Sequence, residues 1–375
     1  MQKIPVNEPA ISKNALKYVT DCIKTGWISS SGKYLKDFEQ KFSKFLGVKH
    51  AITTTNGTTA LHLAVLALGI KEGDEVILPS HTMMASVAAI VYTGATPVLV
   101  DVERDSWNMD VSQIEKKINK RTKAIMPVHI YGHPVDMDPV IALAKKYRLY
   151  IIEDAAESTG AEYKGKQTGT IGDIGCFSFY ANKIITTGEG GMMVTDNDKV
   201  ADHARLLKDM AHSPQKRFLH KEIGFNFRMT NLQAALGVAQ LEEVKKYIQK
   251  KRWMAALYNK RLSKIEGLTL PIEHDWAKNV YWMYGILVEK DFGISRDEFM
   301  QKLFRKGIDT RTFFIPMHRQ PALRRLGLFK GEKYPVSDEI GRLGLYLPSG
   351  LAITKEQIEI VCRAIKDIRN DVQKL

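Results

Sequence analysis

Cysteine is scarce in this sequence, with three residues, Cys22, Cys176 and Cys362, among 375. Because they are odd in number and far apart, they offer neither a disulfide framework nor the close pairs of a zinc site. We therefore expect three buried small hydrophobic side chains and no bound metal.

Long hydrophobic runs are also absent. No stretch of about 18 apolar residues occurs, and the N-terminal MQKIPVNEPAISKNAL lacks the apolar core of a signal peptide. These absences exclude an ordinary membrane-spanning helix and favour a cytoplasmic protein without a membrane partner. With 44% hydrophobic residues, the chain can bury a full core in one large or two unequal domains.

Two nucleotide-binding motifs are missing. The segment GAEYKGK over 160–166 has the glycine and lysine spacing of a P-loop, but Gln167 follows where Ser or Thr would hold magnesium. It also neither follows a predicted strand nor opens a predicted helix. No G-x-G-x-x-G follows the first predicted strand, so a nicotinamide dehydrogenase has little support.

The composition is basic, with a formal net charge of +13. Lys and Arg are dispersed among Glu and Asp, as in LEEVKKYIQKKRW over 241–253, and no helix-turn-helix or basic recognition helix is evident. This pattern favours a solvated basic surface and no nucleic-acid partner. The alternative is a regulatory protein without catalytic activity, which a salt-dependent affinity for DNA would support.

Strand and helix signals alternate over the first 160 residues. Apolar strand-like segments cover 50–55, 74–80, 96–102, 123–132 and 149–157, and helix-like segments cover 58–68, 86–94, 111–119 and 137–148. Repeated units of this kind predict an α/β fold with a mainly parallel sheet covered by helices on both faces.

The alternation is lost after a long helical stretch over 225–262. The remaining sequence predicts a strand over 280–290 and helices over 296–307 and 355–368, as in a small α+β unit. We therefore expect a large domain over 1–245 and a small C-terminal domain over 246–375.

Polar residues follow two of the predicted strands, where parallel sheets bind their ligands. After the first strand, TNGTTA places Gly57 and Thr58 at a helix start, which suits a phosphate or is a plain helix cap. After the fifth strand, IIEDAAE places Asp154 and Glu157 at the sheet edge. An apolar strand that delivers a carboxylate into a cleft favours a functional charge over a solvated one.

Lys183 lies between two apolar strand-like segments, CFSFY and MMVT, in a polar turn. Taken alone, it is an ordinary exposed lysine. A phosphate cradle, a carboxylate and a lysine on one sheet are, however, the three groups that pyridoxal phosphate (PLP) needs for its phosphate, its pyridine nitrogen and its aldehyde. Apolar flanks would desolvate the amine and make it nucleophilic.

Long segments of the chain are shared with one known family. They are TGWISSSGKYLKDFE, NGTTALHLA, GDEVILPS, GATPVLVDV, IEDAAES, GDIGCFSFYANKIITTGEGGM and FNFRMTNLQAALG. In their order and in their spread over nearly the whole chain, the sequence resembles the DegT/DnrJ/EryC1/StrS sugar aminotransferase family. The resemblance implies the type I fold of PLP-dependent transferases.

The resemblance also implies roles at the cofactor ring. Lys183 would bond to the cofactor and shuttle a proton, Asp154 would pair with the pyridine nitrogen, and Glu157 would lie near the ring oxygen. Relatives usually place an aromatic residue on the ring where this sequence has Met83. A thioether can contact a π face, so stacking would be weaker but not lost.

At the cofactor phosphate, the resemblance implies Gly57, Thr58 and Ser178 as ligands. Asn226, in NFRMTN, would cross the interface of a homodimer to the phosphate of the partner subunit. The active site would then need two chains.

For the substrate, the resemblance implies a nucleotide-linked 4-keto-6-deoxy sugar and glutamate as amino donor. TKAIMPVHIYG, DMDP and FFIPMH are most similar to perosamine synthases, which favours GDP-4-keto-6-deoxymannose over the alternative UDP- or dTDP-linked 4-keto-6-deoxyglucose. The substrate-binding residues that it implies are Trp27, Ser29, Arg228 and His318.

Overall fold

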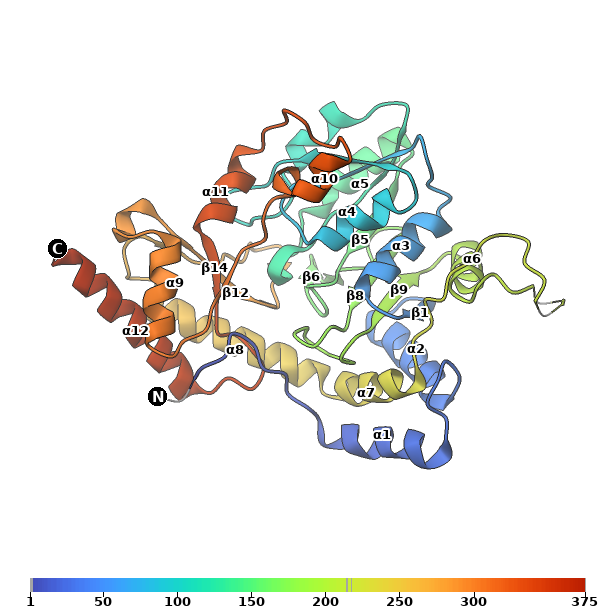
Figure 1. Cartoon of the computed structure of the whole chain (residues 1–375), viewed down its shortest axis with the longest axis horizontal. Helices are drawn as coiled ribbons and strands as arrows, with labels where there is room; N and C mark the ends of the chain where they lie inside the picture. Colours follow the sequence, from blue (N-terminus) through green and yellow to red (C-terminus); the bar gives the residue numbers. More distant parts are fainter. Residues whose placement is uncertain (1–2, 214, 217, 375) are drawn as a thin grey trace.

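The computed structural model describes residues 3–213, 215, 216 and 218–374. A large sheet lies at the centre between two layers of helices, and a smaller antiparallel sheet with long helices lies beside it (Figure 1). Both ends of the described chain belong to this smaller part, where Ile4 packs in the same core as the helix over Lys355–Gln373.

The described residues form a seven-stranded central sheet, as the sequence predicts. Its strands, in spatial order, are β1 (His50–Thr54), β9 (Gly191–Thr195), β8 (Ile174–Ser178), β5 (Tyr150–Asp154), β4 (Thr122–Ile125), β2 (Glu75–Pro79) and β3 (Thr96–Val100). β9 runs antiparallel to both of its neighbours, and the other pairs are parallel. The mainly parallel α/β fold is therefore confirmed.

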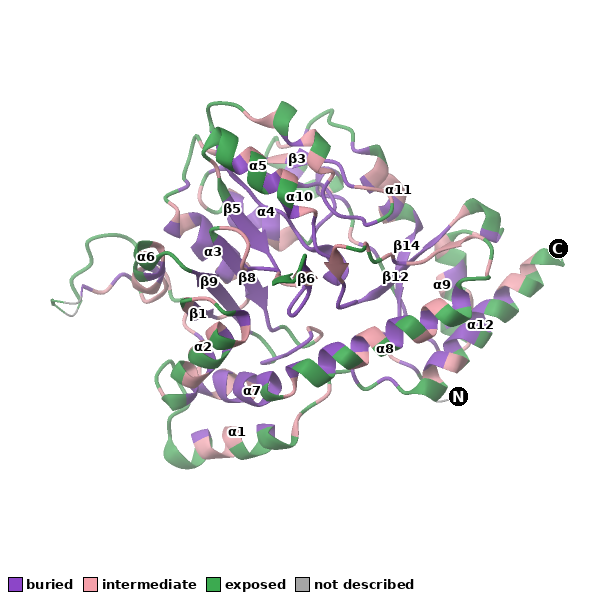
Figure 2. Ribbon diagram, turned by 180° about the vertical axis from the view of Figure 1, so that it is seen from behind, coloured by how far each residue is buried: buried purple, intermediate pink, exposed green. Residues whose placement is uncertain are grey.

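Helices cover both faces of this sheet, which explains why its strands are apolar on both sides. Along β8, Cys176 packs with α3 while Phe177 packs in the opposite cluster with α2 and α7. Figure 2 shows the central strands buried beneath the helices. The helices are α1 (Lys13–Thr25), α2 (Lys33–Leu46), α3 (Gly57–Ala67), α4 (Met84–Val91), α5 (Met137–Tyr147), α6 (Asp198–Lys208), α7 (Asn231–Glu242), α8 (Val244–Leu262), α9 (Arg296–Arg305), α10 (Pro321–Arg325), α11 (Pro335–Leu343) and α12 (Lys355–Gln373).

The helix predicted over 111–119 is wrong. The segment forms two 3-10 turns, Val111–Gln113 and Glu115–Lys117, because Ile114 is the one fully buried side chain in it and Ile118 already has extended backbone angles. A single buried side chain is too little apolar contact to support a full helix. Further 3-10 turns are Ile130–Gly132, Lys290–Phe292 and Met317–Arg319.

The long helix predicted from 225 begins later. Thr230 caps α7, and its hydroxyl accepts a hydrogen bond from the Gln233 amide while the Gln233 side chain reaches back to the Thr230 amide. This capping box fixes the start of α7 at Asn231. The preceding residues are extended, and Asn226 pairs with Asp209 in an isolated β-bridge.

The C-terminal part of the described chain contains a four-stranded antiparallel sheet, packed against α8, α9 and α12. Its strands are β10 (Leu268–Thr269), β12 (Tyr284–Val288), β14 (Gly344–Leu347) and β13 (Arg311–Thr312), and a three-stranded sheet contains β11 (Ala277–Lys278), β6 (Glu162–Tyr163) and β7 (Lys166–Gln167). β6 lies before residue 245 and β11 after it. The predicted domain boundary at 245 stays a prediction.

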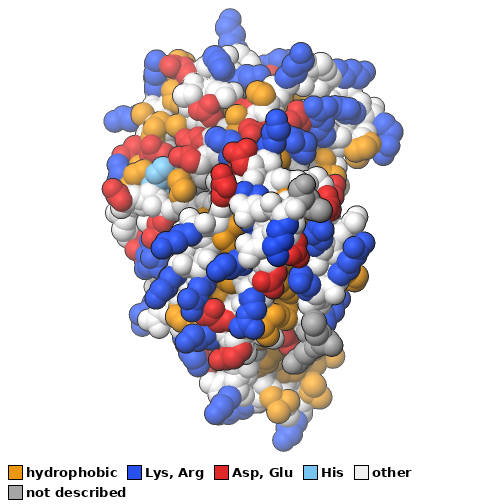
Figure 3. Space-filling view, turned by 90° about the vertical axis from the view of Figure 1, so that its left-hand side faces the viewer, with side chains coloured by type: hydrophobic (Ala, Val, Ile, Leu, Met, Phe, Trp, Pro, Cys, Tyr) orange, Lys and Arg blue, Asp and Glu red, His pale blue; other side chains and the backbone are white. Residues whose placement is uncertain are grey.

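Buried and surface residues follow the composition. All three cysteines are buried and unpaired, which confirms their expected role as small hydrophobes. Figure 3 shows a face on which Lys and Arg are interspersed with Asp and Glu. In the described part of the chain, no helix is both long and apolar enough to cross a membrane.

Asp101 ties the C-terminal part to the central sheet. It follows β3, and its buried carboxylate accepts hydrogen bonds from the amide of Val336 (3.0 Å) and from the amide (2.9 Å) and hydroxyl (2.7 Å) of Ser337. These amides begin α11, so the carboxylate acts as a cap supplied from another element. Ser80, at the end of β2, also bonds to Ser337 through its hydroxyl.

We expect Asp101→Ala to lower the free energy of unfolding by about 3 kcal/mol, because two buried amides lose their acceptor. Urea denaturation followed by circular dichroism measures the change. Asp202→Ala, which removes an exposed carboxylate on α6, is the control and should leave the transition in place. Equal transitions for the two variants would contradict the bridging role of Asp101.

Candidate active site

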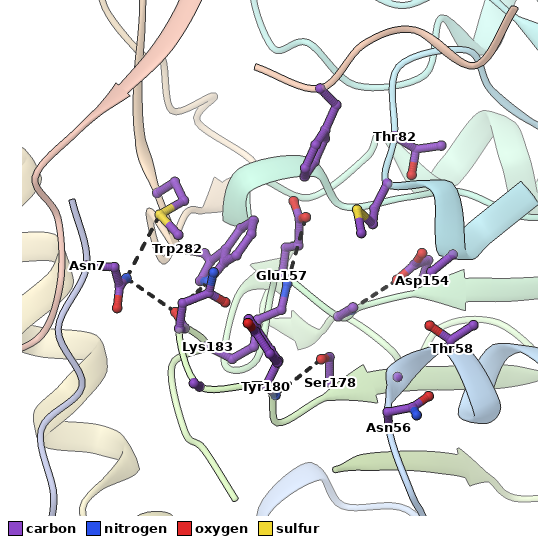
Figure 4. A pocket seen from close by; sticks show the side chains of 18 of the residues that line it. Asn7, Asn56, Thr58, Thr82, Asp154, Glu157, Ser178, Tyr180, Lys183 and Trp282 are labelled. Carbon is purple, nitrogen blue, oxygen red and sulfur yellow. Dashed lines mark hydrogen bonds and ion pairs between the residues drawn. The ribbon is translucent and has the colours of Figure 1, made fainter. Parts of the chain in front are cut away.

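A cavity of about 680 Å³ opens at the carboxyl ends of the central strands. Its walls include Gly57 after β1, Asp154 at the end of β5 and Ser178 at the end of β8 (Figure 4). Trp282 and Tyr346 from the C-terminal part close the opposite side. The cavity therefore lies where a parallel sheet is expected to bind its ligand.

The N-terminus of α3 forms one wall of the cavity. Asn56 caps the helix, with its side-chain oxygen 2.9 Å from the Thr59 amide, and Gly57 and Thr58 line the cavity. Amides in the first turn of a helix have no intrahelical acceptor and attract anions. A Cβ at position 57 would lie 2.8 Å from the Ser178 Cβ, so only glycine lets the two chain segments approach.

Asp154 presents a buried carboxylate to the cavity. Its Oδ2 accepts a hydrogen bond from the Ser86 hydroxyl (2.7 Å), and its Oδ1 accepts one from the Ala156 amide (3.1 Å). Burial raises the pKa of Asp154, and these hydrogen bonds oppose that shift. A cation placed beside this carboxylate would therefore be strongly favoured.

Lys183 lies in the reversal between β8 and β9. Its Nζ is 3.8 Å from Oε1 of Glu157 and 3.5 Å from the ring centroid of Trp282, and its side chain is 11% exposed. Glu157 is fixed by the Tyr131 amide, which donates to its Oε2 at 2.8 Å. Burial lowers the pKa of Lys183 and raises the pKa of Glu157, while their mutual attraction opposes both shifts.

This donor set fits PLP. The glycine-lined helix start suits a phosphate, the buried carboxylate suits a protonated pyridine nitrogen, and the desolvated amine suits an aldehyde. Met83 also lines the cavity, with half of its side chain exposed there. The predicted residues Gly57, Thr58, Met83, Asp154, Glu157, Ser178 and Lys183 are thus brought together in one cavity.

Five other predicted residues lie outside the described lining of this cavity. Asn226 and Arg228 bond to each other, with the Arg228 Nε 2.9 Å from the Asn226 Oδ1. Trp27 lines a separate pocket beside α1 and α2, and Ser29 is exposed close by. His318 is buried, with its Nε2 3.0 Å from Oδ1 of Asp338. Their roles stay predictions.

Sequence reasoning missed many residues of the cavity, and three of them come from the parts of the chain that lack any site motif. Trp282, Asn7 and Tyr346 come from distant parts of the chain, and each lines the cavity. Trp282 and Tyr346 stand in apolar segments typical of a core, and Asn7 stands in an N-terminal segment without a motif. A single sequence does not reveal which distant residues lie close together in the fold, so no local pattern could have identified these three.

Comparisons with known proteins agree with this geometry. Residues 9–366 match the DegT/DnrJ/EryC1/StrS aminotransferase family. The GDP-perosamine synthase of Escherichia coli O157:H7 is 44% identical over 99% of this chain and 100% of its own. DesV from S. venezuelae, a solved structure, superposes with a TM-score of 0.90 and is 32% identical over the full length of both chains.

A second solved structure is the PLP form of the putative sugar aminotransferase Spr1654 from Streptococcus pneumoniae, with a TM-score of 0.92 and 26% identity over 99% of both chains. The fold and the cavity define a PLP-dependent sugar-nucleotide aminotransferase. The chain belongs to the DegT/DnrJ/EryC1/StrS aminotransferase family.

We expect Glu157→Gln to lower the apparent pKa of Lys183 in the cofactor-free protein by about one pH unit, because the variant removes the charge that stabilises the ammonium. More neutral amine would then be present near pH 8. Competitive labelling with an aryl fluoride across pH, with peptide mapping, measures the change. Glu189→Gln alters another carboxylate-bearing residue of the cavity and is the matched control. An unchanged Lys183 profile in Glu157→Gln would refute the coupling.

Proposed function

We propose that this enzyme transfers the amino group of glutamate to C4 of GDP-4-keto-6-deoxymannose, giving GDP-perosamine and 2-oxoglutarate. The observation that carries the proposal is the 44% identity to a GDP-perosamine synthase over essentially the whole of both chains. Fold and cofactor site are common to many sugar aminotransferases, so they support the reaction class and not the choice of sugar.

In the proposed reaction, Lys183 is the proton carrier. Its Nζ takes a proton from Cα of glutamate and later delivers one to C4 of the sugar, and burial favours the first transfer because it lowers the pKa of the amine below its usual value. When PLP is bound, Asp154 would keep its pyridine nitrogen protonated, and Glu157, 3.8 Å from the Lys183 amine, would orient that amine. When bound, PLP supplies a ring that accepts the electron pair released at the reacting carbon.

Binding of the substrate diphosphate requires cationic groups at the cavity. Arg311 lines the cavity and is exposed, and its guanidinium can donate two hydrogen bonds to phosphate oxygens. We assign it to the diphosphate. This assignment applies equally to GDP-, UDP- and dTDP-linked sugars, because a guanidinium does not distinguish the base.

The proposed assembly is a homodimer in which Asn226 and Arg228 serve the cavity of the partner. The loop after α6, which leads to these residues, projects from the body of the molecule in Figures 1 and 2. Ile223 on this loop is 85% exposed, and Leu16 on α1 is 77% exposed. We assign a second copy of this chain as the partner that covers these side chains.

For the substrate, we expect turnover with GDP-4-keto-6-deoxymannose to exceed turnover with UDP- and dTDP-linked 4-keto-6-deoxyglucose by at least about tenfold in kcat/KM, the discrimination that one or two base contacts supply. Parallel assays with glutamate and mass spectrometry of the products measure it. Preference for a UDP or dTDP substrate would overturn the sugar assignment and leave the aminotransferase class standing.

For the shared site, we expect Lys183→Ala and Asn226→Ala homodimers to be nearly inactive, and their isolated heterodimer to regain about half of the natural activity. One of its two sites would then contain both natural residues. Differently tagged, co-expressed chains provide the heterodimer.

The matched control is the heterodimer of Lys183→Ala with Asp154→Ala. Both residues line the cavity of their own chain, so neither site of that heterodimer would be intact. Recovery in the control, or an active monomer in sedimentation, would count against a site shared through Asn226.

A further inference from the structure

Trp282 contacts the Lys183 amine and the backbone of the residue before it. The ring centroid of Trp282 lies 3.5 Å from the Lys183 Nζ, and its indole N–H donates a 2.8 Å hydrogen bond to the carbonyl of Asn182, the residue before Lys183 (Figure 4). The same carbonyl accepts a longer hydrogen bond from the side-chain Nδ2 of Asn7 at 3.4 Å. One indole therefore fixes the backbone that carries the lysine and also faces the lysine amine.

Lys251 donates a hydrogen bond to the backbone of Trp282. It lies on α8, is 1% exposed, and its Nζ donates to the carbonyls of Trp282 (2.7 Å) and Ser349 (2.5 Å). Burial lowers its pKa to about 7, with no charged group of the described chain opposing that shift. A lysine buried with two carbonyls and no carboxylate is costly, and its two hydrogen bonds hold the backbone of Trp282 and Ser349 in place.

An aminotransferase releases its lysine from the cofactor while the cofactor carries the amino group. During that interval the free Lys183 amine must stay close to the cofactor. It must also not form an ion pair so stable that the amine cannot return to the cofactor. We propose that Trp282 is a positioning residue that holds the free Lys183 amine beside Glu157, and that Lys251 fixes Trp282 in place.

The physical basis is the attraction of an ammonium to the face of an indole ring, which needs no proton acceptor. The charged and titratable side chains around Lys183 are Glu157, at 3.8 Å, and Asp154, together with Tyr180, Glu189, Arg311 and Tyr346 on the cavity wall. Glu157 and Trp282 both favour the ammonium. Removal of the ring should therefore lower the pKa of Lys183 without altering either carboxylate.

The test compares Trp282→Phe and Trp282→Leu in the cofactor-free protein. The apparent pKa of Lys183, from competitive labelling across pH, should fall by about one unit in Trp282→Leu and by less in Trp282→Phe, which keeps a weaker π face. Trp253→Leu, on the outer part of α8, is the matched control and should change nothing. An unchanged pKa in Trp282→Leu, or equal shifts in Leu and Phe, would overturn the proposal.

If Trp282→Leu does not fold, the comparison of Trp282→Phe with the natural chain replaces it, and an unshifted pKa of Lys183 in Trp282→Phe overturns the proposal.

Lys251→Met and Lys251→Arg test whether Lys251 fixes Trp282 in place. The Met variant should shift Lys183 in the same direction as Trp282→Leu, and the Arg variant, which keeps donors for both carbonyls, should restore at least part of the natural profile. A natural profile in Lys251→Met would show that Trp282 needs no such support.

Discussion

The structure depends on the burial of one amine, that of Lys183. An ammonium removed from water must either lose its proton or pair with a negative group, and the surroundings of Lys183 in this cavity favour both outcomes. Desolvation favours the neutral amine, whereas Glu157 at 3.8 Å and the indole of Trp282 favour the charged one. Opposed influences leave an amine that can gain and lose a proton, which a proton carrier in transamination requires.

Glu157 can balance Lys183 only if it stays in place. Its Oε2 accepts from the amide of Tyr131, a residue with a positive φ of 52°. Such a conformation is unfavourable for a bulky residue and persists where its surroundings impose it. Here the Tyr131 side chain is buried between His81, Trp282 and Phe313. The packing of Trp282 and Phe313 around Tyr131 therefore also determines where the Glu157 carboxylate lies.

The sheet supports the site from its other face as well. Alternation along β5 directs Asp154 into the cavity and Glu153 away from it. Glu153 is fully buried and accepts hydrogen bonds from the amides of Gly169, Ile171 and Gly172, with the His129 Nε2 2.9 Å away. The two adjacent carboxylates therefore differ in role: Asp154 faces the cavity, and Glu153 fixes the loop over 169–172 beside the end of β5.

Sequence reasoning located the residues whose signal is local. Gly57, Asp154 and Lys183 each follow an apolar strand, and strand ends meet at one edge of a parallel sheet, so their proximity was predictable. Trp282 and Lys251 were not predictable, because they occur in apolar or amphipathic segments whose patterns indicate only burial. The helix expected over 111–119 was wrong because periodicity does not show whether a neighbour exists to bury the apolar face.

The distant residues also make the site rigid. Asp101 attaches α11 to the end of β3, and Met317 donates its amide to the carbonyl of Ser80 at the end of β2. These bonds join the segment after β13 to the ends of β2 and β3, and Thr82 and Met83, just after β2, line the cavity. Because this segment is bonded to the central sheet that carries Lys183, the walls of the cavity are ordered before ligand arrives, and little free energy of binding is spent on ordering them.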